Sequence, residues 1–197
     1  MTSDCLVVTS WGSLPINANF AILVLIAVTG CIYALRLIRS KQIADELERL
    51  PIGIEVVHHP STALAIKTGE LTGWRHIWHF QTTVRLTIDR PLQIEKYGMG
   101  VWHRGRWFYS RDRSPIAIGP YISPNCTVFS AQDFVQEFHC PGGWVEPGVE
   151  YCDANNWAGS GGLRTFQQNW FFIARDEEGC RYKGEAIINL DGRLNWR

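Results

Sequence analysis

The chain has 197 residues, which is enough for a membrane anchor and one domain, and it carries 19 basic and 19 acidic side chains. A net charge of zero supplies no field that would attract nucleic acid, and this argues against nucleic acid as a partner. The 9 Trp, 18 Gly and 9 Pro are typical of a β domain with an aromatic core and many turns.

The sequence begins with a long stretch, from Cys5 to Leu35, that holds no charged side chain. Its most apolar part, from Phe20 to Ile38, is long enough as a helix to cross a hydrocarbon core, which takes ~20 apolar residues. We therefore predict a short tail over residues 1–13 and a transmembrane helix over residues 14–38.

Aromatic and basic side chains flank this helix where it would meet the two membrane interfaces. We expect Trp11 and Tyr33 to lie at the interfaces, and Arg36 and Arg39 to extend toward the headgroups at the second one. The basic flank follows the helix, so the positive-inside rule predicts an outside N-terminus and a cytoplasmic domain. The opposite topology stays open. Residues 1–19 contain no Lys or Arg, unlike a signal peptide.

Helical periodicity continues past the predicted span. Ile43, Leu47 and Leu50 share one face of a helix, and Pro51 then ends it. We predict a helical extension over residues 39–50, whose apolar stripe packs on the domain, on lipid headgroups or on a partner helix. Residues 51–197 would form the tryptophan-rich β domain.

The clearest strand signal lies between Trp78 and Ile88, where apolar and polar residues alternate. The Asp191-Gly192 pair predicts a tight hairpin. Many short strands with turn residues between them predict an antiparallel β-barrel or β-sandwich with at most one short helix. Further strands are expected at residues 101–109, 116–118, 127–129, 170–174 and 185–190, and the short helix at residues 131–138.

The segment from Val101 to Tyr109 combines arginine and aromatic residues. As one strand it would place four side chains on a single face, where guanidinium groups could hold phosphate and rings could stack on a base. The alternative is an exposed face whose arginines stack on neighbouring rings and pair with the acidic residues that follow. The candidate ligand-binding residues are Trp102, Arg104, Arg106 and Phe108.

Of the 6 Cys, Cys140 and Cys152 flank a short loop rich in Gly and Pro. A disulfide between them is one expectation for an oxidising compartment, and free buried thiols are the other. The sequence of residues 125–127 is a formal glycosylation acceptor, which matters only for a lumenal domain.

Motifs for catalysis or cofactor binding are missing from the sequence, so we expect neither an enzyme nor a cofactor. Ser160 lies among glycines without the Gly-x-Ser-x-Gly pattern or the lysine of a phosphate loop. The histidines do not converge: His58 and His59 are adjacent, and His76 and His79 are three apart. We expect no metal site.

An apolar helix from Phe20 that leads into a β domain ending in Asp-Gly-Arg resembles the arrangement of pilins and pseudopilins. The sequence departs from that family's pattern because it lacks a basic leader and a Gly before Phe20, and because Val24 stands where the family usually has Glu. The resemblance implies an extracytoplasmic module.

Three functions follow from these observations. The first is a single-pass membrane protein whose β domain is a non-enzymatic scaffold or accessory subunit, with the lipid bilayer and other membrane subunits as partners. The second is a membrane-anchored sensor of a small anionic ligand such as a nucleotide. The third is the extracytoplasmic pilin-like or disulfide-stapled module.

Overall fold

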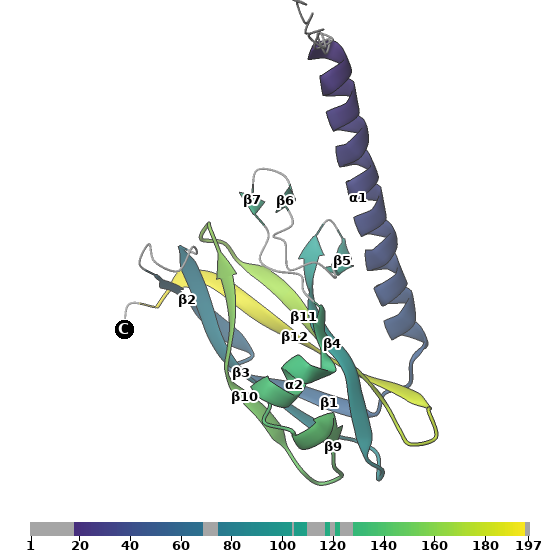
Figure 1. Ribbon diagram of the computed structural model, residues 1–197. Coiled ribbons are helices and arrows are strands. Elements are labelled where there is room, and N and C mark those ends of the chain that lie inside the picture. The colour runs from purple at the N-terminus through teal and green to yellow at the C-terminus, as the bar shows by residue number, and fades with distance from the viewer. Residues whose placement is uncertain are drawn as a thin grey trace, which may run out of the picture. The chain divides into compact units, whose positions relative to one another are not determined.

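The computed structural model describes residues 18–68, 75–103, 105–109, 117–118, 121–122 and 128–195. The chain divides into two compact units, Met1–Leu35 and Arg36–Arg197. The predicted fold class is confirmed, because a long apolar helix precedes a mainly-β domain whose sheet curls into a half-barrel (Figure 1).

Helix α1 (Ala18–Arg49) begins in the apolar stretch and continues through the predicted extension. Its side chains from Phe20 to Leu35 are exposed, and Thr29 Oγ1 donates a hydrogen bond to the carbonyl of Leu25 within the helix (2.7 Å). Among the described residues, α1 is the one helix long and apolar enough to cross a membrane. It ends at Arg49 because the residue before Pro51 is disfavoured in helical conformation.

The strands of the domain form one large sheet and one small one. The 10-stranded sheet follows the order β1-β3-β2-β12-β11-β4-β5, with β10 on β3 and with β8 and β9 on β4, whereas β6 and β7 pair alone. The pairs are antiparallel except β2 with β12, which run parallel. The strands are β1 (Ile54–His59), β2 (Thr62–Lys67), β3 (His76–Leu86), β4 (Leu92–His103), β5 (Arg106–Tyr109), β6 (Ala117–Ile118), β7 (Tyr121–Ile122), β8 (Val128–Ser130), β9 (Trp144–Val145), β10 (Tyr151–Ser160), β11 (Phe166–Arg175) and β12 (Arg181–Leu194).

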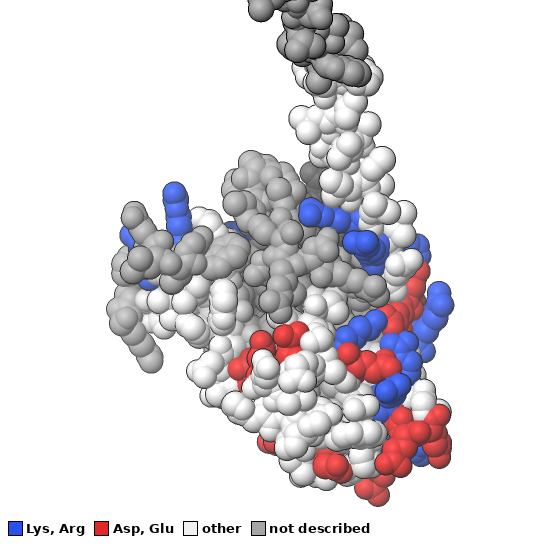
Figure 2. Space-filling model, viewed as in Figure 1, with Lys and Arg blue, Asp and Glu red and all other residues white. Residues whose placement is uncertain are grey.

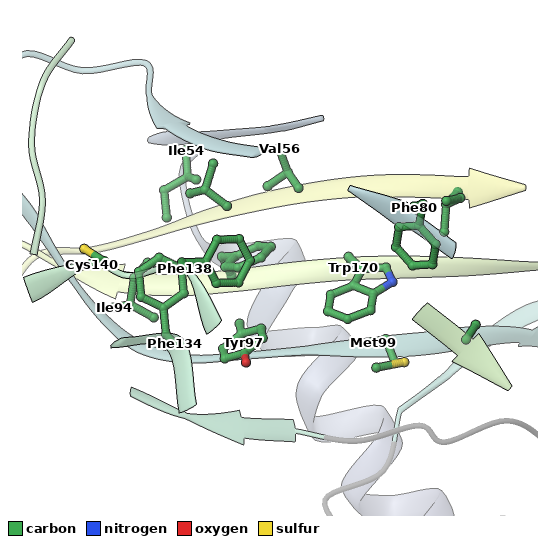
Figure 3. Packing of buried hydrophobic residues seen from close by; sticks show 14 of the residues in the cluster. Ile54, Val56, Phe80, Ile94, Tyr97, Met99, Phe134, Phe138, Cys140 and Trp170 are labelled. Carbon is green, nitrogen blue, oxygen red and sulfur yellow. The ribbon is translucent and has the colours of Figure 1, made fainter. Parts of the chain in front are cut away.

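Aromatic side chains fill the inside of the curled sheet (Figure 3). The ring of Tyr97 on β4 stacks on Phe172 of β11, with centroids 5.3 Å apart, and Trp170 lies between Phe80 and Met99 in the close view. As predicted, Trp78, Phe80 and Val84 of β3 face inward. The interior is therefore a packed core.

The short helix α2 (Ala131–Glu137) covers part of this core. It begins with a capping box, in which Ser130 Oγ accepts from the backbone of Asp133 while the Asp133 carboxylate accepts from the backbone of Ser130. The helix and the residue after it bring Phe134 and Phe138 onto Tyr97 and Phe172. A 3-10 turn, η2 (Pro141–Gly143), follows.

The last turns of α1 belong to the same compact unit as the sheet. Ile43 and Leu47 are buried with Tyr109, Phe171 and Ile173 on the outer face of β5 and β11. The predicted apolar stripe thus packs on the chain's own domain, the first of the three outcomes that the sequence left open.

The predicted hairpin at Asp191-Gly192 is wrong, because β12 runs through both residues. The register between β12 and β2 shifts between Asp191 and Leu194, as in a β-bulge. Gly192 is required there, since a Cβ atom would lie 2.8 Å from the carbonyl carbon of Arg164. The Gly192 amide donates instead to Thr165 Oγ1 (2.9 Å).

Charged side chains reinforce the contact between α1 and the sheet. Glu46 accepts hydrogen bonds from Lys96 of β4 (2.8 Å) and from Arg181 of β12 (2.7 Å), and Arg181 also donates to Glu95 (2.8 Å). Basic and acidic side chains lie side by side on this face of the domain (Figure 2). Burial alone would raise the pKa of Glu46, but the hydrogen bonds from Lys96 and Arg181 outweigh it and hold the pKa below its usual 4.5.

We expect Glu46→Gln to lower the free energy of unfolding by about 1–2 kcal/mol at neutral pH, because it removes a charge that two cations share. The native pKa is lowered, so the stabilisation is present above pH 4.5 and is lost as the pH falls through the native value. Denaturant unfolding of both proteins at several pH values tests this, and the two curves should converge in acid. Glu48→Gln, on an exposed position of the same helix, is the control. An equal loss in both variants would contradict the prediction.

Candidate functional site

The segment predicted as one arginine-rich strand is a hairpin. Strands β4 and β5 pair so that Trp102 lies opposite Trp107 and His103 opposite Arg106. Gly105 has φ of 80°, a left-handed conformation that a glycine adopts without strain and that reverses the chain. Arg104 lies outside the described residues. Side chains alternate along each strand as predicted. The turn at Gly105, however, divides the segment, so residues before and after the turn do not share the single face that one strand would give them.

Two of the candidate ligand residues therefore point in opposite directions. The rings of Trp102 and Trp107 meet edge to face, with centroids 5.1 Å apart, and Trp102 is 45% exposed. Phe108 pairs with Val101 and is buried with it on the other face. The guanidinium of Arg106 lies over the Phe108 ring, 5.2 Å from its centroid. This contact is of the kind expected if the arginines stack on neighbouring rings.

A groove lies beside the contact between α1 and the hairpin. Trp102 and Phe108 belong to different faces of the hairpin, but both of them and Arg106 contribute to its lining. Its volume is about 610 Å³, within the range of ligand pockets, roughly 300–1,000 Å³. The lining is mainly apolar, with aliphatic side chains from the helix and rings from the hairpin. The helix supplies Leu37, Ile38, Ala44 and Leu47, and the hairpin supplies Trp102, Trp107, Phe108 and Tyr109.

A buried hydrogen bond joins the two walls of the groove, and further contacts fix the hairpin wall. The backbone amide of Tyr109 donates to Ser40 Oγ on α1 (2.9 Å). The Tyr109 ring covers Gly100 on the paired strand, where a Cβ atom would lie 2.5 Å from the ring. Asn169 donates to the Tyr109 hydroxyl (3.0 Å) and to Glu185 (2.8 Å). The groove is thus a preformed feature of the Arg36–Arg197 unit.

The three basic side chains of the groove differ in whether they are paired with a carboxylate. Lys41 pairs with Asp45 (2.7 Å), and Lys183 pairs with Glu185 (2.7 Å). Arg106 is exposed, and within the described part of the chain no carboxylate forms a salt bridge with it. Arg106 is therefore the cation best placed to receive an anion from outside the domain.

Sequence reasoning selected the hairpin wall of this groove but missed the helical wall. The sequence shows the apolar stripe of the extension, but nothing in it shows that Leu37 and Ala44 line the same groove as Trp102. Arg36 is half-buried, and Arg39 and Tyr33 are exposed on α1, whereas Trp11 lies outside the described residues.

Cys140 and Cys152 carry free thiols, so the disulfide that the sequence allowed is not formed. Cys140 is buried, donates to the carbonyl of Trp144 (3.0 Å) and has its pKa raised to about 11 by burial. The Cys140 thiol also forms a hydrogen bond with the side chain of Tyr151. Cys152 follows Tyr151 on β10, and alternation along a strand therefore points it away from Cys140, to the solvent.

A buried polar cluster lies apart from the groove. Thr82 Oγ1 accepts from Asn156 Nδ2 (2.7 Å) and contacts His58 Nδ1 (3.1 Å), while His58 Nε2 lies 3.4 Å from the carbonyl of Ala186. The carbonyl can only accept, so Nε2 carries the proton and Nδ1 accepts from the Thr82 hydroxyl. Burial lowers the pKa of His58 to about 4 despite the hydrogen bond to Ala186, so the imidazole is neutral.

One group of side chains has the spacing of metal ligands. Ligand atoms of Asp176, Glu178 and Cys180 lie within 4.8 Å of one another at the turn between β11 and β12. The Asp176 carboxylate, however, already accepts from Arg90 (3.1 Å) and from the Cys180 amide (2.8 Å). Ser160, the other residue considered for chemistry, is buried and accepts from the amide of Gly162 (3.2 Å).

The chain matches no protein-family model and no curated protein sequence.

Proposed function

We propose that this chain is a single-pass membrane protein whose β domain serves as a non-enzymatic scaffold or accessory subunit of a membrane complex. The observation that carries the proposal is the exposed apolar stretch of α1, from Phe20 to Leu35, in a helix of sufficient length to cross a bilayer. Leaving such a surface in water would be costly, and lipid is its natural solvent.

The interior of the domain supports a scaffold role. The inside of the curled sheet is filled by Trp78, Tyr97, Phe134, Phe138 and Trp170, so the half-barrel has a core in the place where many β-barrels hold a ligand. The groove beside the end of α1 is one surface on the outside of the sheet that is open for recognition.

Fractionation of the full chain from its native membrane tests the anchor. The protein should stay in the membrane after washes with high salt and alkaline carbonate, and detergent should release it with stoichiometric partner subunits. Release by carbonate would contradict the anchor. Recovery of a clean monomer in mild detergent would contradict the accessory-subunit role.

Topology can be read from the thiols that the structure exposes. Arg36, Arg39 and Lys41 follow the apolar stretch, and we propose on this basis that the domain is cytoplasmic. In a variant that keeps only Cys152 and Cys180, an impermeant thiol reagent should label intact cells only after permeabilisation. Labelling without permeabilisation would favour the extracytoplasmic alternative. A variant that keeps Cys140 alone should resist labelling in both states, because its thiol is buried.

A second candidate function is that of an anchored sensor of a small anionic ligand. It is favoured by one observation, that Trp102 and Arg106 line the same groove. A thermal-shift screen of the protein with nucleotides, repeated with Arg106→Gln, tests it. The idea fails if no nucleotide stabilises the protein or if the variant responds as the wild type does.

A further inference from the structure

The groove between α1 and the hairpin has two chemically different parts. Its walls are aliphatic on the side of Leu37, Ala44 and Leu47 and aromatic on the side of Trp102 and Trp107. Its rim carries the exposed cations Lys41 and Arg106 and one exposed acid, Glu48. The ligand that matches both parts is amphipathic, with an apolar body and an anionic head.

The position of the groove along the chain points to the source of such a ligand. Leu37 and Ile38, the last residues of the predicted span, are themselves part of the lining. Lys41 follows Ile38 by three residues, which is ~5 Å along a helix and comparable to the depth of one headgroup layer. If α1 spans the bilayer, the groove opens within reach of the lipid headgroups.

The charge on this part of α1 favours an anionic lipid over a neutral one. The residues from Arg36 to Lys41 include three basic side chains and no acidic one. Basic residues directly beside a membrane span attract anionic headgroups. Trp102, exposed at the hairpin next to Arg106, is the type of side chain that is enriched at membrane interfaces.

A nucleotide fits the groove less well than a lipid does. Four of the helical residues that line the groove are aliphatic, Leu37, Ile38, Ala44 and Leu47, and a base would bury polar atoms against them at a cost. An acyl chain has no such groups to satisfy.

We propose that the groove binds one anionic phospholipid. The acyl chain lies between Ala44 and the Trp102–Trp107 pair, and the phosphate is held by Arg106 with Lys41 nearby. Arg106 offers a planar fork of N–H donors that matches phosphate oxygens, and the Lys41 pair with Asp45 is solvent-exposed and can open at little cost. The proposal rests on the membrane anchor, because the bilayer supplies the lipid.

The test uses the full chain in nanodiscs of phosphatidylcholine that contain a minor fraction of phosphatidylglycerol, followed by native mass spectrometry of the lipids retained on the protein. We expect one retained phosphatidylglycerol and a loss of about tenfold in its apparent affinity for Arg106→Gln. Arg193→Gln, which removes another exposed arginine, on β12, should bind as the wild type does. Ala44→Phe, which fills the groove and leaves the cations in place, should also lose the lipid.

The outcomes separate the lipid site from the anchor. A chain that does not enter nanodiscs would overturn the anchor and the lipid site together. The lipid site would be overturned, and the anchor would stand, if the chain entered nanodiscs but showed no preference for phosphatidylglycerol over phosphatidylcholine. The same would follow if Arg106→Gln retained as much phosphatidylglycerol as the wild type. Displacement of the lipid by a nucleotide or by inorganic phosphate at comparable concentration would assign the groove to a soluble anion and would also overturn the proposal. Far-UV circular dichroism of each variant checks that it is folded.

Discussion

Replacing Trp170 with Ala lowers the free energy of unfolding by about 3–5 kcal/mol, the largest effect that we expect from a single substitution in the domain. Trp170 is 2% exposed and lies at the centre of the aromatic cluster, with its ring near those of Phe80 (6.0 Å), Phe129 (6.4 Å) and Tyr97 (6.5 Å). Its indole Nε1 donates to Gln168 Oε1 (3.3 Å). Truncation would leave a cavity between two strands that the surrounding rings could fill only in part.

Denaturant unfolding followed by far-UV circular dichroism measures this effect without depending on tryptophan fluorescence. The matched control is Trp157→Ala, because Trp157 is 44% exposed on β10. The control should change the free energy of unfolding by less than about 1 kcal/mol, since exposed positions away from special contacts tolerate substitution. Similar losses in the two variants would mean that Trp170 is not the centre of the core.

The second large effect is a loss of stability in mild acid caused by His58. The fold lowers the pKa of this buried imidazole from 6.5 to about 4, so the unfolded chain takes up a proton at a pH where the native protein does not. The stabilisation is therefore complete above pH 6.5 and is lost as the pH falls toward 4. Between pH 6.5 and 4.5, above the titration of Glu46, we expect a loss of roughly 2–3 kcal/mol.

Unfolding curves of the wild type and of His58→Leu across this range test the assignment. The variant should be less stable at pH 7, because Thr82 and Ala186 lose a partner, but it should lose much less stability on acidification. His59→Gln, at the exposed neighbouring position, should keep the slope of the wild type. A His58→Leu protein with an unchanged slope would assign the acid sensitivity to other groups.

The elements predicted most clearly from the sequence are those with one apolar face and one polar face. The alternation from Trp78 to Val84 identified β3, and the i, i+4 spacing of Ile43 and Leu47 identified the docked end of α1. In both segments an apolar face packs on the core and a polar face contacts water, so the spacing of apolar residues indicates the type of element.

Strand β4 was harder to predict because its pattern is set by tertiary contacts. Glu95 and Lys96 look like surface residues, but Arg181 and Glu46 neutralise them against the sheet. Gly98 and Gly100 look like turn residues, yet both are in the strand, and Gly100 makes room for the Tyr109 ring. These partners are distant in sequence and become visible only in the fold.

The candidate site shows the same limit. The mixture of arginine and aromatic residues correctly marked the segment around Trp102 and Arg106, but the turn at Gly105 and the helical wall of the groove could not be read from that segment. A single glycine between two arginines is compatible with a strand or a turn, and the choice depends on the pairing of β4 with β5.

The central claim is that α1 spans a bilayer, and spin labels along the helix test it most directly. Single labels at Leu23 and Ile26, in a background without other cysteines, are placed in nanodiscs and compared with a label at Arg49, at the end of the helix. Power saturation should show Leu23 and Ile26 accessible to oxygen and shielded from a water-soluble nickel chelate, with the reverse at Arg49. Nickel accessibility at Leu23 and Ile26 equal to that at Arg49 would contradict the membrane anchor.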